Sequence, residues 1–227
     1  MLSPGEWQIL STSFAVAFWA VLLTLPLAIG AALALARRFS GSVVLDGFVH
    51  LPIILPPVLT GFLLLLLFGR NGPIGHFLDQ SFGIRLAFTR QAAILATSVM
   101  VFPILVRAVR IAFEAADARL YEAAAVLRAS PWDRFLTVAL PLAGPGIVAG
   151  AVTAFAAGMG EFGAVITFAA NIPGETQTLP LAIYSAMQLP DGEARAIRLA
   201  AISFALAMAG LVGAELFQRR MLKRLKG

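Results

Sequence analysis

Long apolar segments, separated by short polar stretches, run through almost the whole chain. A helix needs about 20 mostly apolar residues to cross the hydrocarbon core of a bilayer, and five segments reach that length. They extend over about Leu10–Ala36, Phe48–Phe68, Gln91–Phe113, Pro141–Phe162 and Ile197–Phe217. The pattern predicts an all-α integral membrane protein with about five transmembrane helices. No low-complexity linker divides the chain, so residues 1–227 are expected to form a single transmembrane domain.

The composition favours the same class of protein. Hydrophobic residues make up 59% of the 227 residues and charged residues 13%, whereas soluble domains average about 45–50% and about 25%. The chain contains no cysteine, which excludes disulfides, thiolate metal sites and cysteine nucleophiles.

The basic residues border the apolar segments and predict the orientation of the chain. Cytoplasmic connections of membrane proteins carry an excess of Lys and Arg. With the N-terminus outside and the C-terminus in the cytoplasm, 12 of the 17 basic residues face the cytoplasm and 5 face outside. The cytoplasmic group is Arg37, Arg38, Arg107, Arg110, Arg119, Arg128, Arg134, Arg219, Arg220, Lys223, Arg224 and Lys226. The outside group is Arg70, Arg85, Arg90, Arg195 and Arg198. Because topology accounts for these positions, no nucleic-acid partner is expected.

The polar stretch over residues 114–140 lies between the third and fourth predicted spans and is therefore cytoplasmic. Four residues in it recur at the spacing of one helix face, and two of the four are alanines: Leu120, Ala123, Ala124 and Leu127. Such a shallow face suits docking against another surface. Ser130 is expected to cap a second short helix, with Pro131 at its first position and Asp133 three residues after the cap. The stretch thus predicts a helix, a tight turn and a short helix that stops at Leu140–Pro141.

An energy source is not encoded in the chain. The phosphate-binding pattern G-x-x-x-x-G-K-[ST] is absent, and the only lysines are Lys223 and Lys226. His50 and His76 fall on opposite sides of the predicted membrane, so they cannot share a metal ion, and no catalytic site is expected. Transport would therefore be driven by a partner or by a gradient.

The string EAAAVLRAS–PWDRFLTVALP resembles the EAA loop of bacterial ABC-importer permeases. The matching positions are Glu122, Ala123, Ala124, Leu127, Ala129, Leu140 and Pro141, while Arg128 stands at the position of the family's glycine. The resemblance implies that this cytoplasmic loop seats in a cleft of an ATPase subunit and transmits its closure. At Arg128, either the turn moves to Ala129–Ser130 or the side chain reaches an acidic group on the ATPase. A simply solvated arginine is the alternative.

Two longer strings, HLPIILPPVLTGFLLLLLFGRNGPIG and GEFGAVITFAANIPGETQTLPLAIYS, resemble the molybdate-type oxyanion permeases. The resemblance implies the type I ABC importer fold and a homodimer in the bacterial inner membrane. It also implies two cytoplasmic ATP-binding cassette subunits, which would bind ATP and Mg²⁺, and a periplasmic or extracellular oxyanion-binding protein. This chain itself would hold no cofactor. The implied function is ATP-driven import of molybdate, with tungstate accepted. The alternatives are a sulfate- or thiosulfate-type permease and a gradient-driven carrier or channel.

The permeation pathway is predicted from polar and helix-breaking residues within the apolar segments. Pro56 and Pro57 interrupt the second predicted span, either to line the pathway or only to kink the helix for packing. Glu161 would repel a doubly negative oxyanion, so it is expected to fix a gate rather than bind the ion, unless it lies at the outer interface. Hydroxyl groups are candidates to meet the ion: Thr60, Thr97, Ser98, Thr153 and Thr167. The outer stretch 171–178 reads as an exposed turn, and the resemblance implies that it meets the binding protein.

Overall fold

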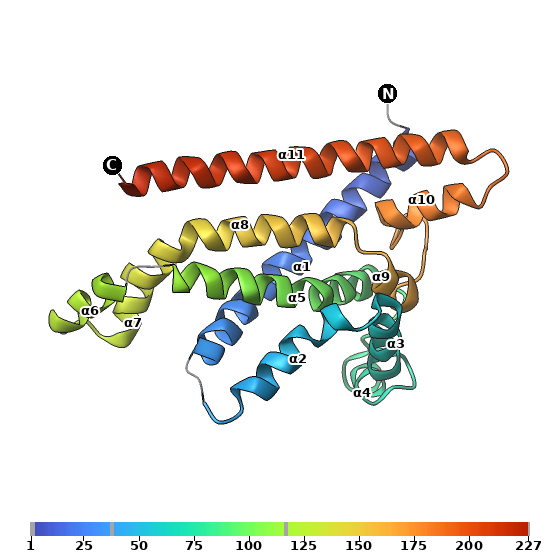
Figure 1. Ribbon diagram of the computed structural model, residues 1–227. Helices are drawn as coiled ribbons and strands as arrows, with labels where there is room; N and C mark the ends of the chain where they lie inside the picture. Colours follow the sequence, from blue (N-terminus) through green and yellow to red (C-terminus); the bar gives the residue numbers. More distant parts are fainter. Residues whose placement is uncertain (1–2, 37–38, 116–117, 227) are drawn as a thin grey trace.

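The computed structural model describes residues 3–36, 39–115 and 118–226, without the side chains of residues 118, 121, 211, 214, 215 and 217–226. Every regular element in these ranges is helical (Figure 1). The helices are α1 (Pro4–Ala36), α2 (Ser42–Ile54), α3 (Pro57–Phe68), α4 (Pro73–Phe82), α5 (Arg90–Glu114), α6 (Ala118–Val126), α7 (Pro131–Arg134), the π-helical segment η1 (Phe135–Ala139), α8 (Leu140–Met159), α9 (Gly163–Phe168), α10 (Leu179–Met187) and α11 (Glu193–Lys226). The all-α prediction is confirmed.

Three helices of the described chain are long and apolar enough to cross a membrane, and a bent pair could form a fourth crossing. The three are Pro4–Ala36, Arg90–Glu114 and Pro131–Met159. The first two contain the first and third predicted spans, and the last contains the fourth except for its final three residues, which lie in the break after α8. The predicted fifth segment lies within α11, where several side chains fall outside the description. The count of five crossings therefore stays a prediction.

The second predicted span, Phe48–Phe68, is broken at the prolines that were expected to interrupt it, and its crossing of the membrane stays a prediction. The segment is two helices, α2 and α3, that meet at an angle of 112°. Leu55, between them, is extended, because a residue that precedes a proline is disfavoured in the α region. Pro56 and Pro57 follow it, and Pro57 starts α3 at a position where its missing N–H costs nothing.

The centre of the molecule is α5, which packs against α1 on one side and α8 on the other. Its residues Val101, Leu105, Val106 and Val109 are almost completely buried. The approach to α8 is close because small residues face one another, with Gly150 against Ala108 and Gly146 against Ala112. In lipid such small-residue contacts are a main source of helix association, since lipid tails offer no hydrophobic driving force.

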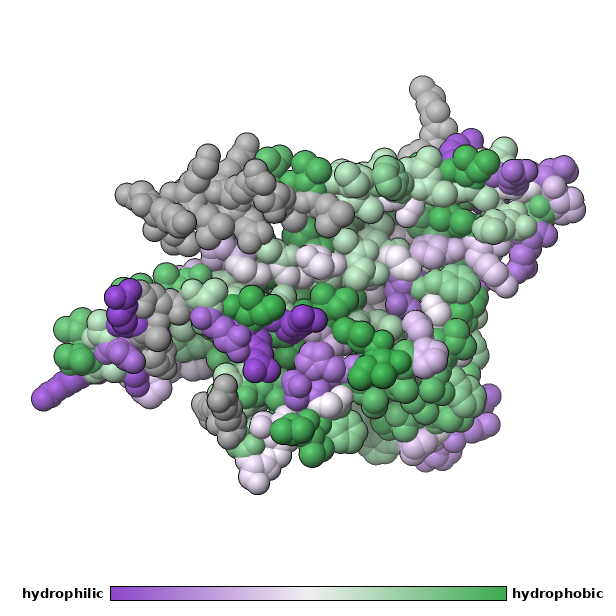
Figure 2. All heavy atoms as spheres, in the orientation of Figure 1, coloured by the Kyte–Doolittle hydropathy of each residue, from purple (hydrophilic) through white to green (hydrophobic). Residues whose placement is uncertain are grey.

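The two ends of the helix bundle differ in what they carry. The C-terminal ends of α1, α5 and α11 and the N-terminal end of α8 lie at the end from which α6 and α7 protrude, while α4, α9 and α10 lie at the other end (Figure 1). Apolar surface covers much of the space between the ends, and polar residues gather over α6 and α7 and at the opposite end (Figure 2). The segments that were predicted to share one side of the membrane thus lie at the same end of the bundle, and the assignment of the α6–α7 end to the cytoplasm stays a prediction.

Candidate functional site

The coupling loop, defined here as residues 114–140, carries an apolar tip that nothing in the described chain covers. Val126 is 84% exposed, Leu127 82% and Trp132 67%. The predicted docking face is also open, because Leu120 and Ala123 are exposed and only Ala124 is half-buried. Large apolar side chains in such positions mark an interaction surface.

Arg128 itself ends α6, with a left-handed φ of 61°. Its N–H donates to the carbonyl of Ala125 (3.0 Å), and the N–H of Ala129 donates to the carbonyl of Ala124 (3.1 Å). These two bonds form a Schellman motif, whose left-handed position is usually glycine. Of the alternatives for Arg128, the turn moved to Ala129–Ser130 is wrong: arginine adopts the glycine conformation in place, at a steric cost of about 1–2 kcal/mol.

The predicted cap of the second short helix is confirmed. The N–H of Asp133 donates to Ser130 Oγ (3.1 Å), and that hydroxyl in turn donates to the Asp133 carboxylate. Pro131 occupies the first turn. The cap fixes the direction in which the short helix leaves the turn.

The prediction that this helix stops at Leu140–Pro141 was wrong, because α7, η1 and α8 form one continuous helical run, Pro131–Met159. In an α-helix the proline ring would clash with the carbonyl four residues earlier. The chain avoids this with a π turn directly before Pro141, in which the N–H of Leu140 donates to the carbonyl of Phe135, five residues back. The hydroxyl of Thr137 donates to the carbonyl of Asp133 (2.6 Å) within the same turn.

An aromatic stack that sequence reasoning missed links the loop to α5. The ring centroids of Trp132 and Phe135 are 5.7 Å apart, and those of Phe135 and Phe113 are 6.0 Å apart. Trp132 and Phe135 are three residues apart, which is the spacing of neighbours on one helix face. That spacing could have predicted the contact between Trp132 and Phe135. The contact with Phe113 could not be predicted, because no local sequence pattern relates α5 to the loop.

A second site forms where α3 packs on α9, and we call this contact the helix junction. A methyl group built on Gly61 would lie 2.6 Å from the carbonyl oxygen of Ala164, and one built on Gly163 would lie 2.7 Å from Pro57 Cβ. Both distances are too short for any side chain, so each glycine allows the other helix to approach. The junction joins the break after α2 to the break after α8.

Several predicted pathway residues meet at this junction. Glu161 lies in the break between α8 and α9, where its Oε1 accepts the N–H of Ala164 (2.9 Å). Thr167 donates to the carbonyl of Gly163 (2.8 Å). Thr60 is buried on α3, and its hydroxyl has no hydrogen-bond partner among the described residues. Pro56 and Pro57 begin the same unit.

The remaining predicted pathway residues lie elsewhere. Thr97 is fully buried on α5, where its methyl group would touch a side chain placed at Gly158 of α8. Ser98 donates to the carbonyl of Ala20 on α1 (3.4 Å). Thr153 is exposed on α8 and donates to the carbonyl of Ala149 in its own helix (3.0 Å). The predicted set is therefore divided between the junction, the packed surface of α5 and an exposed position on α8.

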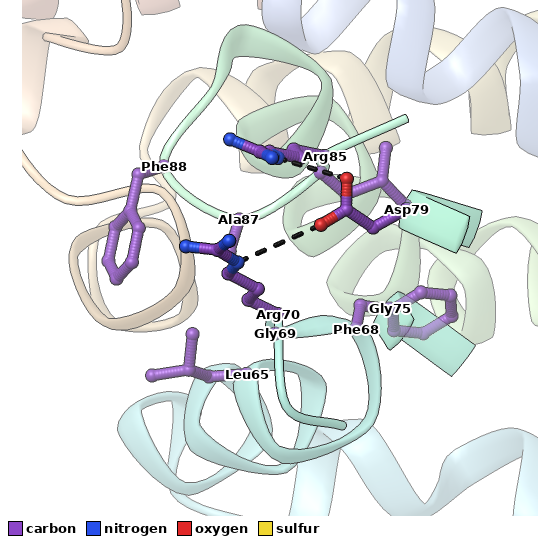
Figure 3. Close-up of a pocket in the computed structure, with 10 residues that line it drawn as sticks. Leu65, Phe68, Gly69, Arg70, Gly75, Asp79, Arg85, Ala87 and Phe88 are labelled. Carbon is purple, nitrogen blue, oxygen red and sulfur yellow. Dashed lines mark hydrogen bonds and ion pairs between the residues drawn. The ribbon is translucent and has the colours of Figure 1, made fainter. Parts of the chain in front are cut away.

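The outer stretch 171–178 is more than the exposed turn that its sequence predicts. Thr176 and Thr178 are buried, while the tip around Gly174 is exposed. Its carbonyl accepts from Gln8 of α1 (3.2 Å). Beside this stretch, α4 and the residues around it form a pocket with Arg70, Asp79 and Arg85 at its rim (Figure 3).

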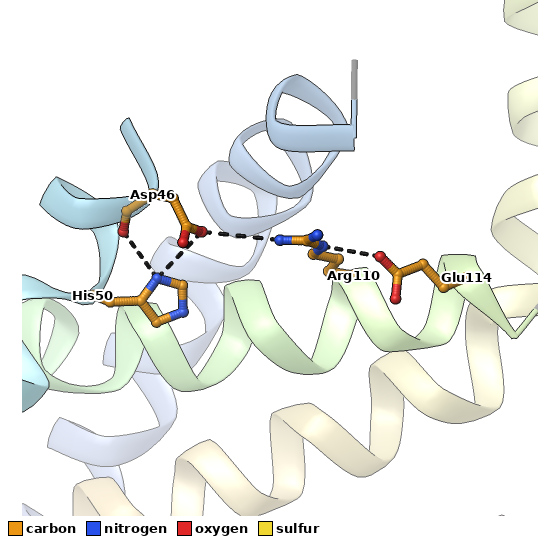
Figure 4. A network of polar contacts seen from close by, with 4 residues as sticks. All are labelled: Asp46, His50, Arg110 and Glu114. Carbon is orange, nitrogen blue, oxygen red and sulfur yellow. Dashed lines mark hydrogen bonds and ion pairs between the residues drawn. The ribbon is translucent and has the colours of Figure 1, made fainter. Parts of the chain in front are cut away.

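A polar network ties α2 to α5 near the coupling loop (Figure 4). His50 Nδ1 lies 2.9 Å from the Asp46 carbonyl oxygen and 3.5 Å from its Oδ1, and Arg110 Nη1 lies 3.9 Å from the same Oδ1. The Nε of Arg110 donates to Glu114 Oε1 (2.9 Å). The contact between Asp46 and Arg110 connects the two helices, and His50 bonds to Asp46 within α2, which gives His50 a structural role.

Comparison with known proteins identifies the family. Residues 24–223 match the family described as "Binding-protein-dependent transport system inner membrane component". The chain is 49% identical over 220 residues to the molybdenum transport system permease protein ModB of Escherichia coli (strain K12), covering 96% of each chain. It is 46% identical over 221 residues to the ModB protein of Haemophilus influenzae, covering 97% of this chain and 96% of that one.

Solved structures with low sequence identity share the fold. The MetNI methionine ABC transporter in an inward-facing conformation gives a TM-score of 0.72 at 18% identity, covering 96% of this chain and 94% of that chain. A bacterial alginate ABC transporter in complex with an alginate-bound periplasmic protein gives 0.76 at 17% identity, covering 96% and 80%. By the match along nearly its whole length and by its relatives, the chain belongs to the binding-protein-dependent transport system inner membrane component family.

Proposed function

We propose that this chain is the transmembrane subunit of an ATP-driven importer that moves molybdate, and also tungstate, across the bacterial inner membrane. The observation that carries the proposal is the coupling loop, whose EAA residues stand on a capped helix pair with an uncovered apolar tip. The relatives of this chain that are named as molybdenum permeases supply the substrate.

The working assembly would contain a second copy of this chain, two cytoplasmic ATP-binding cassette subunits and an external oxyanion-binding protein. ATP and Mg²⁺ would be held by the cassette subunits, because the chain has no phosphate-binding loop of its own. Glu122, Ala123, Ala124, Leu127, Arg128 and Ala129 would form the contact with the ATPase.

A single helical run connects the two candidate sites. The run Pro131–Met159 begins in the coupling loop and ends one residue before the break that contains Glu161. Its 29 residues span about 44 Å at 1.5 Å per residue. A tilt imposed on α7 by the ATPase would be transmitted through α8 to α9, and α9 packs on α3 at Gly61. The stack of Trp132, Phe135 and Phe113 would pass the same movement to α5.

The ion itself would meet hydroxyl and backbone groups rather than arginine clamps, because conduction requires binding weak enough for the ion to leave. Thr60 and Thr167 are the best-placed candidates, since both lie at the helix junction. Glu161 would hold α9 in place through its bond to Ala164, and so act on the gate and not on the ion.

Reconstituted uptake tests the proposal. The purified chain, placed in proteoliposomes with the ATPase subunit and the loaded binding protein, is expected to take up molybdate only when ATP is supplied on the ATPase side. Uptake by the chain alone along an ion gradient would instead establish the carrier or channel alternative. If the chain takes up sulfate equally well from a sulfate-binding protein of matched affinity, its substrate class would be tetrahedral oxyanions in general rather than molybdate.

A further inference from the structure

A pocket of about 240 Å³ lies at the end of the molecule opposite the coupling loop. It is bounded by the end of α3, the turn into α4, and the segment that leads to α5 (Figure 3). Its wall is apolar and its rim is charged. The wall is built mainly from Leu65, Phe68, Leu86, Ala87 and Phe88.

Two arginines at the rim share one carboxylate. Arg85 Nε donates to Asp79 Oδ1 (3.0 Å), and Arg70 Nε lies 3.7 Å from Asp79 Oδ2. Each arginine faces Asp79 with its Nε, and the terminal nitrogens have no other partner among the described residues. Figure 3 shows these nitrogens pointing to the side of the pocket where Phe88 lies. The Asp79 carboxylate thus orients both guanidinium groups before any ligand binds. The three side chains together carry a net charge of +1.

The pocket stands directly on the helix junction. The N–H of Phe88, in the wall, donates to the carbonyl of Phe168, the last residue of α9 (3.2 Å). The rings of Phe68 and Phe168 also pack, with centroids 6.3 Å apart. A group that enters the pocket therefore contacts the end of α3 directly and is linked to the end of α9 through Phe88.

We propose that this pocket receives an acidic side chain of the external oxyanion-binding protein, and that Arg70 and Arg85 are its contact residues. The proposal rests on the proposed function, which places this end of the molecule outside. Guanidinium groups bind carboxylates through paired N–H donors, and the apolar wall accommodates the aliphatic stem and its apolar neighbours. Docking in the pocket would act on α9 through Phe88, so the junction would sense the binding protein.

A free oxyanion fits the pocket less well than a protein side chain. The two arginine side chains are 74% and 64% exposed, so an isolated ion would remain hydrated and screened by salt. A docked protein excludes water from the rim and adds apolar contacts, which strengthens the same charge pair.

Charge reversal tests the contact. The affinity of the loaded binding protein would be measured for the permease–ATPase complex in nanodiscs, at low and at physiological salt. Arg70→Glu combined with Arg85→Glu is expected to weaken binding by about tenfold or more and to flatten its salt dependence, because attraction becomes repulsion. The matched control is Arg195→Glu, an exposed arginine in the first turn of α11 outside the pocket, which should change binding by about twofold or less. Wild-type affinity in the double variant would overturn the proposal.

Site-directed cross-linking gives a readout that does not depend on the arginine variants folding. Because the chain has no cysteine, Ala87→Cys places a single thiol at the pocket, where a benzophenone maleimide can be attached. We expect a light-induced adduct with the binding protein, and none with the ATPase subunit. Leu127→Cys in the coupling loop should give the reverse pattern. Absence of a binding-protein adduct at residue 87 would refute the pocket as the docking site.

The same experiment separates this inference from the proposed function. If wild-type uptake requires both partners but residue 87 forms no adduct, only the docking inference fails. If residue 127 forms no ATPase adduct and wild-type uptake needs no ATP, the proposed function fails.

Discussion

The coupling loop and the helix junction are built on opposite principles. In the loop, backbone groups are satisfied by neighbours in sequence, through the Arg128 turn and the Ser130 cap, and the large apolar side chains are left uncovered. At the junction, glycines bring two distant segments into contact, and Thr60 and Ala164 are buried between them. The loop therefore presents an open apolar surface, whereas the junction is closely packed. Under the proposed function, the loop would receive the ATPase and the junction would seal the pathway.

The largest expected effect concerns the uncovered tip of the loop. Trp132→Ala should weaken ATPase binding by about 2–4 kcal/mol, because an exposed tryptophan at a docking surface is a typical energetic centre of an interface. The matched control is Trp7→Ala, since Trp7 is 66% exposed at the opposite end of the chain and Trp132 is 67% exposed. Titration of the ATPase subunit onto the permease measures both. Equal ATPase affinities for the two variants would show that the tip of the loop is not part of the ATPase interface.

The next prediction tests the close packing of α3 on α9 at the junction. Gly61→Ala should destabilise the α3–α9 contact by about 1–3 kcal/mol, because the added methyl group meets the backbone of Ala164 and overpacked sites cost that much. Uptake should fall with it. Gly144→Ala is the control, since a methyl group there meets nothing within 4 Å. Thermal unfolding in detergent and uptake in proteoliposomes are the measurements, and an unchanged Gly61→Ala protein would contradict the close packing.

A smaller effect is expected at Glu161. Glu161→Ala removes the acceptor for the Ala164 N–H and should cost about 1 kcal/mol, as the loss of a capping group does. Glu161→Gln keeps an oxygen that can accept this bond, so it isolates the contribution of the charge. A gate role that rests on this bond predicts reduced uptake in Glu161→Ala with ATPase binding unchanged, and a contribution of the charge predicts reduced uptake in Glu161→Gln as well. Wild-type uptake in Glu161→Gln would exclude a role for the charge.

The smallest effect should appear at the turn of the loop, and its direction is stabilising. Arg128→Gly relieves the left-handed strain and should stabilise the loop by about 1 kcal/mol. Arg128→Ala keeps the strain and removes the charge, so comparing the two variants separates conformation from contact. Weaker ATPase binding in both would show that the guanidinium reaches an acidic group on the partner. Thermal unfolding and the ATPase titration provide the two measurements.

The sequence predicted what depends on neighbouring residues. The apolar segments, the Ser130 cap and the helix-breaking prolines were all readable in this way. The errors arose at two positions where an unusual backbone conformation removed the expected effect of a residue. Arg128 adopts the left-handed conformation that usually requires glycine, and a π turn allows the helix to continue through Pro141. The junction could not be predicted, because the contact of Gly61 with Ala164 joins segments that no local pattern relates. For the same reason, Thr60 and Thr167 were proposed as pathway residues without any sign that they would meet at one contact.

The π turn before α8 also sets the direction in which the coupling loop points. A π turn holds one more residue than the α turn it replaces, and one residue corresponds to about 100° of rotation and 1.5 Å of rise along a helix. The number of residues in η1 therefore determines the angle, around the helix axis, between α8 and the α6–α7 part of the loop. Removing one residue from Phe135–Ala139 would swing Trp132 and the loop tip by about 100° around the axis of α8, without altering any residue at the tip or in α8 itself.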